Sequence, residues 1–304
     1  MRKKLLVIGS AAADVIIRIP HLPHSQEDLL VESQHLSLGG CAANVAMCLK
    51  ALDIPFDLFA PIGSGIYGDF VAEQLQQRGI QSLIPRVEEA NGCCYCLVDE
   101  SGERTFLADH GAEYRFRSEW FSLLHPNDYD GVYLCGLELE ESGSQALMNH
   151  LRDADYPCVY FAAGPRLAHI SPSYLRKLET LPCLFHFNEE EAIRYFDSDD
   201  YQSAAAFLSK QTHRPIIVTR GAQGCFIQAE EAMLLDAFAT QIVDTIGAGD
   251  THIAAIMAAR YSGFSWREAG IFANRASALV LAHAGAQLND DDIATLMTLL
   301  KQPR

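Results

Sequence analysis

Six short apolar runs end at a glycine or a polar residue, and helical patterns separate several of them. The runs lie at residues 4–9, 56–63, 131–136, 157–164, 183–188 and 215–221. The helical patterns lie at residues 41–52, 68–79 and 144–154. This alternation is typical of an α/β fold with a largely parallel sheet. Since such sheets bind ligands beyond the carboxyl ends of their strands, we expect the functional site where the runs end.

Two segments interrupt the alternation. Residues 14–40 and 92–112 have strand patterns with polar turns and no helix, and the second contains a hairpin around residues 100–102. Together they predict a small second sheet, hinged near Gly40 and Gly111, that acts as a lid over the strand ends. The chain contains no repeat, low-complexity tract or linker, so we expect a single domain over residues 1–304.

Charge and hydropathy exclude several classes of partner. The chain has 23 basic and 39 acidic residues and a formal charge of −16, which argues against nucleic acid or an anionic membrane. There is no run of about 18 apolar residues that could cross a membrane. Residues 1–17 pass from two lysines directly into a strand pattern, unlike a signal peptide. We therefore expect a cytoplasmic protein.

The nine cysteines lie in hydrophobic segments and fit small buried side chains in a reducing compartment. Cys93 and Cys96 have the spacing of a redox or metal motif, which is the less favoured alternative. In a strand, residues three apart point to opposite faces, and no second pair completes a zinc site.

The stretch "IVDTIGAGDTHIAAIMAA", residues 242–259, carries the clearest chemical signal. Gly247, Ala248 and Gly249 leave backbone N–H groups open to a ligand, and the helix that follows adds the positive end of its dipole. An anion is therefore expected at this turn. Asp250 would repel that anion unless its carboxylate takes part in the chemistry.

Polar residues at other strand ends could bind a hydroxylated ligand. In "GGCAANVA", Gly39 and Gly40 permit close backbone approach, and the Asn44 amide can both donate and accept. Asp14 follows the first strand and three small residues, and Glu138 follows another strand. Each of these has a purely structural alternative. The "GGCAANVA" stretch could be a tightly packed helix start, Asp14 a solvated aspartate, and Glu138 part of an acidic helix end.

In "FHFNEEEA", Asn188 ends a buried strand and three glutamates at 189–191 begin a helix. The helix dipole alone would stabilise each glutamate by a few tenths of a kcal/mol. The alternative is that Asn188 and one glutamate hold a hydrated Mg²⁺, which prefers oxygen ligands. The residues alone do not choose between Glu189, Glu190 and Glu191.

In "IIVTRGAQGCFI", residues 216–227, a Thr-Arg-Gly-x-x-Gly turn separates two strand patterns. The turn could pass under a nucleotide, with Arg220 near the phosphates, or form a plain β-hairpin.

Taken in order, these motifs resemble the ribokinase family of carbohydrate and nucleoside kinases, also called the PfkB family. "GGCAANVA" and "DTIGAGDTH" resemble its two signatures, "NEEE" its Asn-x-x-Glu, and "TRGAQG" its Thr-x-Gly-x-x-Gly. "FANRASALVLAHAGAQ" resembles the segment that lines the adenine pocket. The resemblance covers essentially the whole chain and implies a ribokinase-like three-layer α/β/α domain with a β-sheet lid. It is nearest to an uncharacterised bacterial sugar-kinase branch that shares "GGCA-x-N", "GERTF" and "DTIGAGD".

The resemblance implies an ATP-dependent phosphotransferase that acts on a hydroxyl of a sugar, expected to be primary. Asp250 would be the general base, and the backbone of Gly247, Ala248 and Gly249 would form the anion hole. The resemblance also selects Glu191 as the partner of Asn188 in organising Mg²⁺ through water.

It further implies binding roles for residues that match the family motifs. Substrate hydroxyls would be bound by Asp14, Gly39, Gly40, Asn44 and Glu138. The nucleotide would be bound by Asn188, Thr219, Gly221, Gly224 and Asn274. The Asp244 side chain and the Ile246 carbonyl resemble the loop that binds a potassium ion in several members.

Several positions depart from the family pattern. His252 replaces the usual phenylalanine, Gly65 and Ala162 replace aspartates, and Glu113 stands where ribokinase has asparagine. Arg166 remains near Ala162 and could contact phosphate. These differences argue against ribose specificity.

Other functions stay open. A ribonucleoside kinase would need an apolar slot for the base, which Tyr95 and Phe106 of the lid could provide. A phosphosugar kinase ranks lower, because the segment around Asp14 and Gly40 lacks basic residues. A non-catalytic sugar or nucleotide sensor is disfavoured because Asp250 and the other motifs occur together. Lid strands with one exposed apolar face predict a homodimer through the lid.

Overall fold

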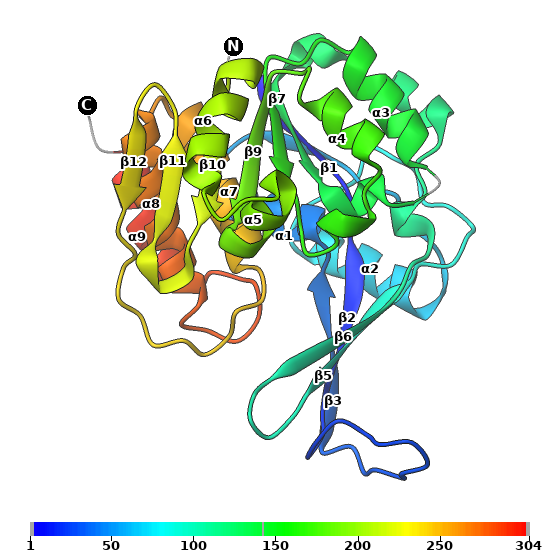
Figure 1. Cartoon of the computed structure of the whole chain (residues 1–304). Coiled ribbons are helices and arrows are strands. Elements are labelled where there is room, and N and C mark those ends of the chain that lie inside the picture. The colour runs from blue at the N-terminus through cyan, green and yellow to red at the C-terminus, as the bar shows by residue number, and fades with distance from the viewer. Residues whose placement is uncertain (1–2, 142, 302–304) are drawn as a thin grey trace.

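The computed structural model in Figure 1 describes residues 3–141 and 143–301 and is built around an eight-stranded sheet. The strand order is β12-β11-β10-β9-β8-β7-β1-β4. Six strands run parallel: β1 (Lys4–Ile8), β4 (Phe56–Phe59), β7 (Tyr129–Cys135), β8 (Val159–Ala162), β9 (Cys183–Asn188) and β10 (Ile216–Thr219). The other two run antiparallel: β11 (Cys225–Gln228) and β12 (Ala232–Leu235). The predicted α/β fold with a mostly parallel sheet is confirmed, and each of the six apolar runs overlaps one of the parallel strands.

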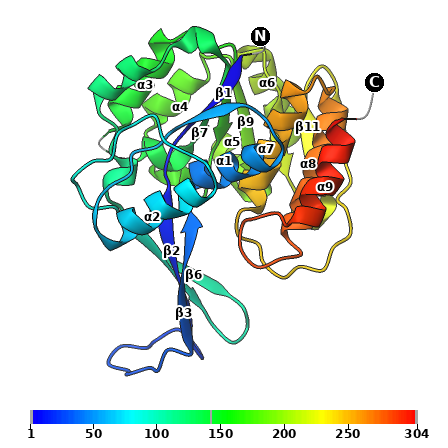
Figure 2. The ribbon, with the colours of Figure 1, turned by 180° about the vertical axis from the view of Figure 1, so that it is seen from behind.

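Helices cover both faces of this sheet, which makes the three layers visible in Figures 1 and 2. Side chains alternate along β1, so that Leu5 and Val7 enter one apolar core while Leu6 and Ile8 enter the other. The first core is completed by α1 (Cys41–Ala51), α2 (Gly65–Gln77), α7 (Ala248–Tyr261), α8 (Trp266–Val280) and α9 (Asp290–Leu300). The second is completed by α3 (Ser144–Asp153), α4 (Pro172–Leu178), α5 (Glu189–Phe196) and α6 (Tyr201–Thr212).

The central helix of the first core is α7, which packs against both α1 and α8. Its residues from Thr251 to Ala259 are all buried, and alanine is the commonest among them. Small side chains let the neighbouring helices approach closely. The starts of α1 and α7 are thereby held together, with consequences for the site described below.

The two interrupting segments form a second sheet of order β3-β2-β5-β6 that projects from the body in Figures 1 and 2. Its strands are β2 (Ala12–Arg18), β3 (Ser33–Gly39), β5 (Cys93–Val98) and β6 (Arg104–Asp109). β2 pairs in parallel with β5, and the two outer pairs are antiparallel. We refer to this small sheet as the lid. The wider prediction of one domain over residues 1–304 includes residues 1–2, 142 and 302–304, which lie outside the described residues.

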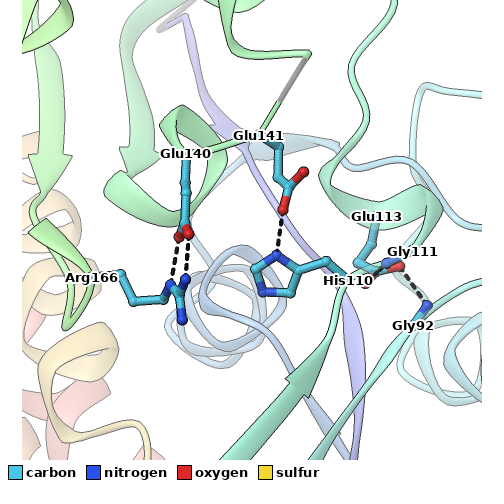
Figure 3. A network of polar contacts seen from close by, with 7 residues as sticks. All are labelled: Gly92, His110, Gly111, Glu113, Glu140, Glu141 and Arg166. Carbon is cyan, nitrogen blue, oxygen red and sulfur yellow. Dashed lines mark hydrogen bonds and ion pairs between the residues drawn. The ribbon is translucent and has the colours of Figure 1, made fainter. Parts of the chain in front are cut away.

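One buried carboxylate holds the place where β5 and β6 join the body (Figure 3). Glu113, 1% exposed, accepts hydrogen bonds from the backbone N–H groups of Gly92 at 2.8 Å and Gly111 at 2.9 Å. The two glycines lie so close that a Cβ on Gly111 would be 2.2 Å from the Gly92 nitrogen. Beside them, His110 Nδ1 lies 2.7 Å from Glu141 Oε1. Because Gly92 precedes β5 and Gly111 follows β6, the side chain of Glu113 fixes both ends of the β5–β6 hairpin.

No helix in residues 3–141 or 143–301 has the length and apolar character needed to cross a membrane.

We expect Glu113→Gln to loosen the lid without unfolding the body. The amide offers only one acceptor oxygen, so one buried backbone N–H loses its partner, at about 1–3 kcal/mol of unfolding free energy. Urea denaturation should record this loss, and hydrogen exchange should be faster in β5 and β6. Glu103→Gln, at an exposed position of the same hairpin, serves as the control. Equal stability and exchange in the two variants would contradict this account of Glu113.

Candidate active site

The turn before α7 has the shape that its sequence predicts. Gly247, at φ 73°, caps the helix in the left-handed conformation, and a Cβ there would lie 2.3 Å from Ala286 Cβ. A Cβ on Gly249 would meet nothing within 4 Å, so this position faces open space. The first N–H groups of a helix have no partner within it. The N–H of Ala248 makes a long bond of 3.4 Å to the Thr245 carbonyl.

Asp250, in the first turn of α7, is bonded to the first turn of α1. Asn44 Nδ2 donates to Asp250 Oδ2 at 2.8 Å. Burial raises the pKa of Asp250 to about 6, although the bonds from Asn44 and Cys41 act in the opposite direction. A carboxylate with a pKa near the working pH is well suited to act as a general base.

A second carboxylate lies close to Asp250. Asp14, on β2, is half-buried, and a Cβ on Gly39 would lie 2.1 Å from its Oδ2. Burial, followed by the negative charge of Asp250, raises the pKa of Asp14 to about 7. The absence of a side chain at Gly39 is therefore what makes room for Asp14. A Cβ on Gly40, which has φ +89°, would lie 2.6 Å from the Ser10 carbonyl oxygen.

Glu138, fully buried after β7, completes this group. Ser10 N donates to Glu138 Oε1 at 2.8 Å. Burial raises the pKa of Glu138 to about 7, while the backbone bond from Ser10 acts against this shift and the Asp250 charge adds to it. Three carboxyl groups thus occupy one region, and each titrates above its ordinary range.

Several buried polar atoms in this region lack a partner among the described residues. They are Ser10 Oγ, Asn44 Oδ1, Tyr133 Oη and Glu138 Oε2. Buried polar atoms without partners are rare and call for an explanation, such as a ligand. Together with Asp14 and Asp250, these residues form a polar cluster whose unpartnered atoms are suited to bonding hydroxyl groups. Sequence reasoning named Asn44 and Glu138 but missed Ser10 and Tyr133, since a tyrosine in mid-strand gives no signal.

A cavity of about 500 Å³ borders the turn before α7. The predicted nucleotide residues Thr219, Gly221, Gly224 and Asn274 line it together with Ala248 and Gly249. Most of its other lining residues are apolar, including Phe238, Ile242, Ala278 and Leu281. This composition and size suit a small ligand with an apolar ring. The sequence allowed either a plain β-hairpin or a nucleotide-binding turn at residues 219–224. The turn connects β10 and β11 as a β-hairpin, and it also forms part of the cavity wall.

A buried hydrogen-bond chain includes two residues of the cavity wall, His252 and Asn274. Asn274 Nδ2 donates to the carbonyls of Leu235 and Asp236, both at 3.0 Å, so its Oδ1 accepts from His252 Nε2 at 3.1 Å. His252 Nδ1 lies 2.9 Å from His186 Nε2. Burial lowers the pKa of both histidines, and the neutral forms fit this chain. His252 and Asn274 therefore position α7 and α8 relative to each other.

Asn188 and Glu191 form a reciprocal cap at the start of α5. Glu191 N donates to Asn188 Oδ1 at 2.8 Å, and Asn188 N donates to Glu191 Oε2 at 2.9 Å. The neighbouring Glu189 and Glu190 instead face Arg220 at 3.6 Å and Arg194 at 3.1 Å. Among the three glutamates, Glu191 is thus the one bonded to Asn188. Asn188 also pairs in register with Thr219, beside the cavity.

This pair fits a metal ion bound through water. Mg²⁺ is commonly held by one or two carboxylates and substrate phosphates and keeps several waters. One carboxylate at the cavity edge meets that description. No cluster of three or more His, Cys, Asp or Glu that could hold a metal was found in the part of the chain that is described, so a dedicated protein cage is not what the residues offer.

Asp244 is bonded on both oxygens. Oδ1 accepts from Arg104 Nη1 and from Ile246 N, and Oδ2 accepts from Gly285 N at 2.8 Å. Burial would raise the pKa of Asp244, but Arg104 and the two backbone donors prevail and lower it. Arg104 lies in the "GERTF" stretch, to which the sequence assigned no role.

Two arginines considered for phosphate binding are engaged elsewhere. Arg166 donates to both oxygens of Glu140 (Figure 3). Arg220 donates to Gln223 and faces Glu189.

Cys93 and Cys96 are buried, and all nine cysteines are free thiols.

Residues 2–293 match the model of the pfkB family carbohydrate kinases. The chain belongs to the pfkB family. As a member, it is a carbohydrate kinase with a ribokinase-like fold, and the resemblance drawn from its motifs is confirmed.

Individual proteins are similar to this chain in sequence or in fold. The uncharacterized sugar kinase YegV of Escherichia coli (strain K12) is 30% identical over 289 residues, which cover 93% of this chain and 90% of that protein. The ribokinase of Arabidopsis thaliana, solved with ribose and ATP, has a TM-score of 0.78 at 22% identity and full coverage of both chains. The nucleoside kinase of Burkholderia thailandensis, solved with inosine, has a TM-score of 0.77 at 21% identity, covering 97% of this chain and 96% of that one.

Asp14→Asn is expected to stabilise this pfkB kinase at alkaline pH. The pKa of Asp14 is about 7 in the folded protein against 3.8 ordinarily. Between these values the folded state holds a proton that the unfolded chain has released, so wild-type stability falls as pH rises through this window. Asparagine does not titrate. The melting temperature of Asp14→Asn minus that of wild type should therefore be larger at about pH 8 than at about pH 4.

Asp130→Asn, at an exposed position of β7, is the control, and its difference from wild type should not follow the same course. If the Asp14→Asn difference stays constant or shrinks with rising pH, the raised pKa is refuted.

Proposed function

We propose that this kinase transfers the γ-phosphoryl group of ATP to a hydroxyl, primary in the simplest case, of a neutral sugar, with Asp250 as the general base. The observation that carries the proposal is the polar cluster beside Asp250, in which buried atoms of Ser10, Tyr133 and Glu138 lack partners among the described residues. A polyhydroxylated acceptor would supply these partners, whereas an apolar ligand would leave them unsatisfied.

In this proposal the acceptor lies between Asp14 and Asp250. Asp14, Glu138 and Asn44 bind its hydroxyls, and Gly39 and Gly40 let it approach the backbone. Asn44 holds Asp250 Oδ2, so we assign proton transfer to Oδ1. The hydroxyl gives its proton to this oxygen while its own oxygen bonds to the γ-phosphorus and the bond from phosphorus to the bridging oxygen of ADP breaks.

The charge that develops on the transferred group is assigned to the backbone N–H groups of Gly247, Ala248 and Gly249. The positive end of α7 supports them, as in other anion holes at helix starts. We place the nucleotide in the 500 Å³ cavity, against Thr219, Gly221 and Gly224. Asn274 would shape the wall near the base, since both hydrogens of its amide are already donated to backbone carbonyls and its oxygen accepts from His252.

Asn188 and Glu191 are the residues that we assign to Mg²⁺, through water. When bound, the ion would offset phosphate charge and orient the phosphates. The pair lies next to Thr219 at the cavity edge, which is the place where the phosphates of a bound nucleotide would run.

A ribonucleoside kinase is the second candidate, and one observation favours it. Phe106 is 55% exposed. Asp14, Cys94 and Ala108 lie in register across the lid. Because Phe106 is two residues from Ala108 on β6, it lies on the same face of the lid as Asp14. An exposed aromatic side chain on the substrate-facing side of the lid could stack on a base. Sugars and nucleosides should therefore be assayed together.

We expect Asp250→Asn to remove turnover while ATP still binds. A positioned base contributes a factor of about 10² to 10⁴, and asparagine preserves the bond to Asn44 but cannot take a proton. ADP release should be measured over a panel of sugars and nucleosides, and ATP affinity by calorimetry, with Asp130→Asn as the control. Wild-type turnover by Asp250→Asn, or no turnover of any acceptor by wild type, would contradict the proposal.

We also propose that two copies of the chain associate through the lid. On the face opposite Asp14, Leu36 and Leu107 are 36% and 55% exposed, and the loop at the end of the lid exposes Leu30 by 87%. Apolar side chains gathered on one small sheet commonly mark an interface.

The free thiols support the expected reducing, cytoplasmic setting.

Leu107→Asp should convert the dimer into a monomer, because it would bury a charge in the proposed interface. Light scattering gives the mass directly. Ala108→Asp, on the opposite face of the same strand, is the control and should remain dimeric. A monomeric wild type would overturn the proposed dimer.

A further inference from the structure

One buried ion pair joins the lid to the loop that leads into α7. Arg104 belongs to β6, and Asp244 lies three residues before Gly247. Their side chains are 19% and 6% exposed. The contact is long-range, since 140 residues separate the partners in sequence. It is therefore a direct link between the lid and the turn that we assign to the anion hole.

The surroundings of Asp244 leave little room for another cation. Both carboxylate oxygens already accept hydrogen bonds: Oδ1 from Arg104 and from Ile246 N at 2.7 Å, and Oδ2 from Gly285 N at 2.8 Å. A potassium ion at this carboxylate would lie next to the guanidinium, and two positive charges at such a distance repel each other. With Arg104 in place, the residues do not fit the potassium site that the sequence suggested at Asp244 and Ile246.

Asp244 also holds the turn in shape. Through Ile246 N and Gly285 N it ties the segment before the turn to the segment around residue 285. Gly247 packs directly on Ala286 in that segment. A positive charge beside Asp244 offsets the cost of burying this carboxylate, which its two backbone donors offset only in part.

We propose that the guanidinium of Arg104 takes the place of a monovalent cation at Asp244, so that the enzyme needs no potassium and its anion-hole turn is set by the position of the lid. This inference rests on the proposed function, since it assigns a task to the same turn. Arg104 is a positioning residue: it acts through Asp244 on the backbone of residues 247–249. Lid opening would withdraw the charge, so the turn would be fully ordered only when the lid is closed.

The first test compares cations at equal ionic strength. Wild-type turnover should change little between potassium chloride and tetramethylammonium chloride. Arg104→Ala should lose up to about a hundredfold in turnover in tetramethylammonium, as expected for a misplaced catalytic group, and regain part of it in potassium. Arg18→Ala is the control: Arg18 is exposed and lies in register with Val98 and Arg104, on the same face of the lid.

The second test does not depend on an acceptor. An ion that binds the folded state raises its melting temperature by mass action. Potassium should therefore raise the melting temperature of Arg104→Ala but not that of wild type or Arg18→Ala. This readout remains informative if no acceptor is phosphorylated, in which case the proposed function fails while the cation inference can still hold.

Three results would overturn the inference. The first is a wild-type enzyme that requires potassium. The second is an Arg104→Ala enzyme with wild-type turnover in tetramethylammonium. The third is an Arg104→Ala protein whose turnover and melting temperature are both unchanged by potassium.

Discussion

The active site depends on two helices that begin at the same place. Asn44 in the first turn of α1 and Asp250 in the first turn of α7 are joined by a hydrogen bond of 2.8 Å. The positive ends of both helices favour a carboxylate there, while burial keeps its pKa at about 6. Gly40 and Gly247, with φ of 89° and 73°, lead the chain into these helices. Asp250 therefore stands beside the polar cluster, while Ala248 and Gly249 of the same helix start line the cavity.

The same arrangement lowers the stability of the protein without ligand. Asp14, Glu138 and Asp250 are carboxyl groups whose pKa is raised by burial, and several nearby polar atoms have no partner among the described residues. Such groups reduce the free energy of unfolding, as is common at functional sites. A bound acceptor would satisfy them. Substrate binding and stability are therefore linked through the same atoms.

Much of the fold could be predicted because it is encoded locally. The glycine-terminated strands, the lid segments and the glycine-rich turn before α7 each appear in a short stretch of sequence. The features that the sequence did not predict arise from tertiary contacts. Arg104 and Asp244 come together only because the lid folds over the 244–247 loop, and Ser10 and Tyr133 become unpartnered only through burial. The reciprocal cap of Asn188 and Glu191 follows a known spacing, yet sequence alone could not separate it from a metal role.

The most direct measurement of the central claim is the pH dependence of kcat/KM for the best acceptor. If Asp250 takes the proton with Asp14 close to it, kcat/KM should fall below an apparent pKa between about 6 and about 7, the values of these two carboxyls. Below that point the decrease should approach about tenfold per pH unit. A profile that stays level down to the ordinary aspartate value of 3.8 would show that no buried carboxylate with a raised pKa accepts the proton, and would contradict the account.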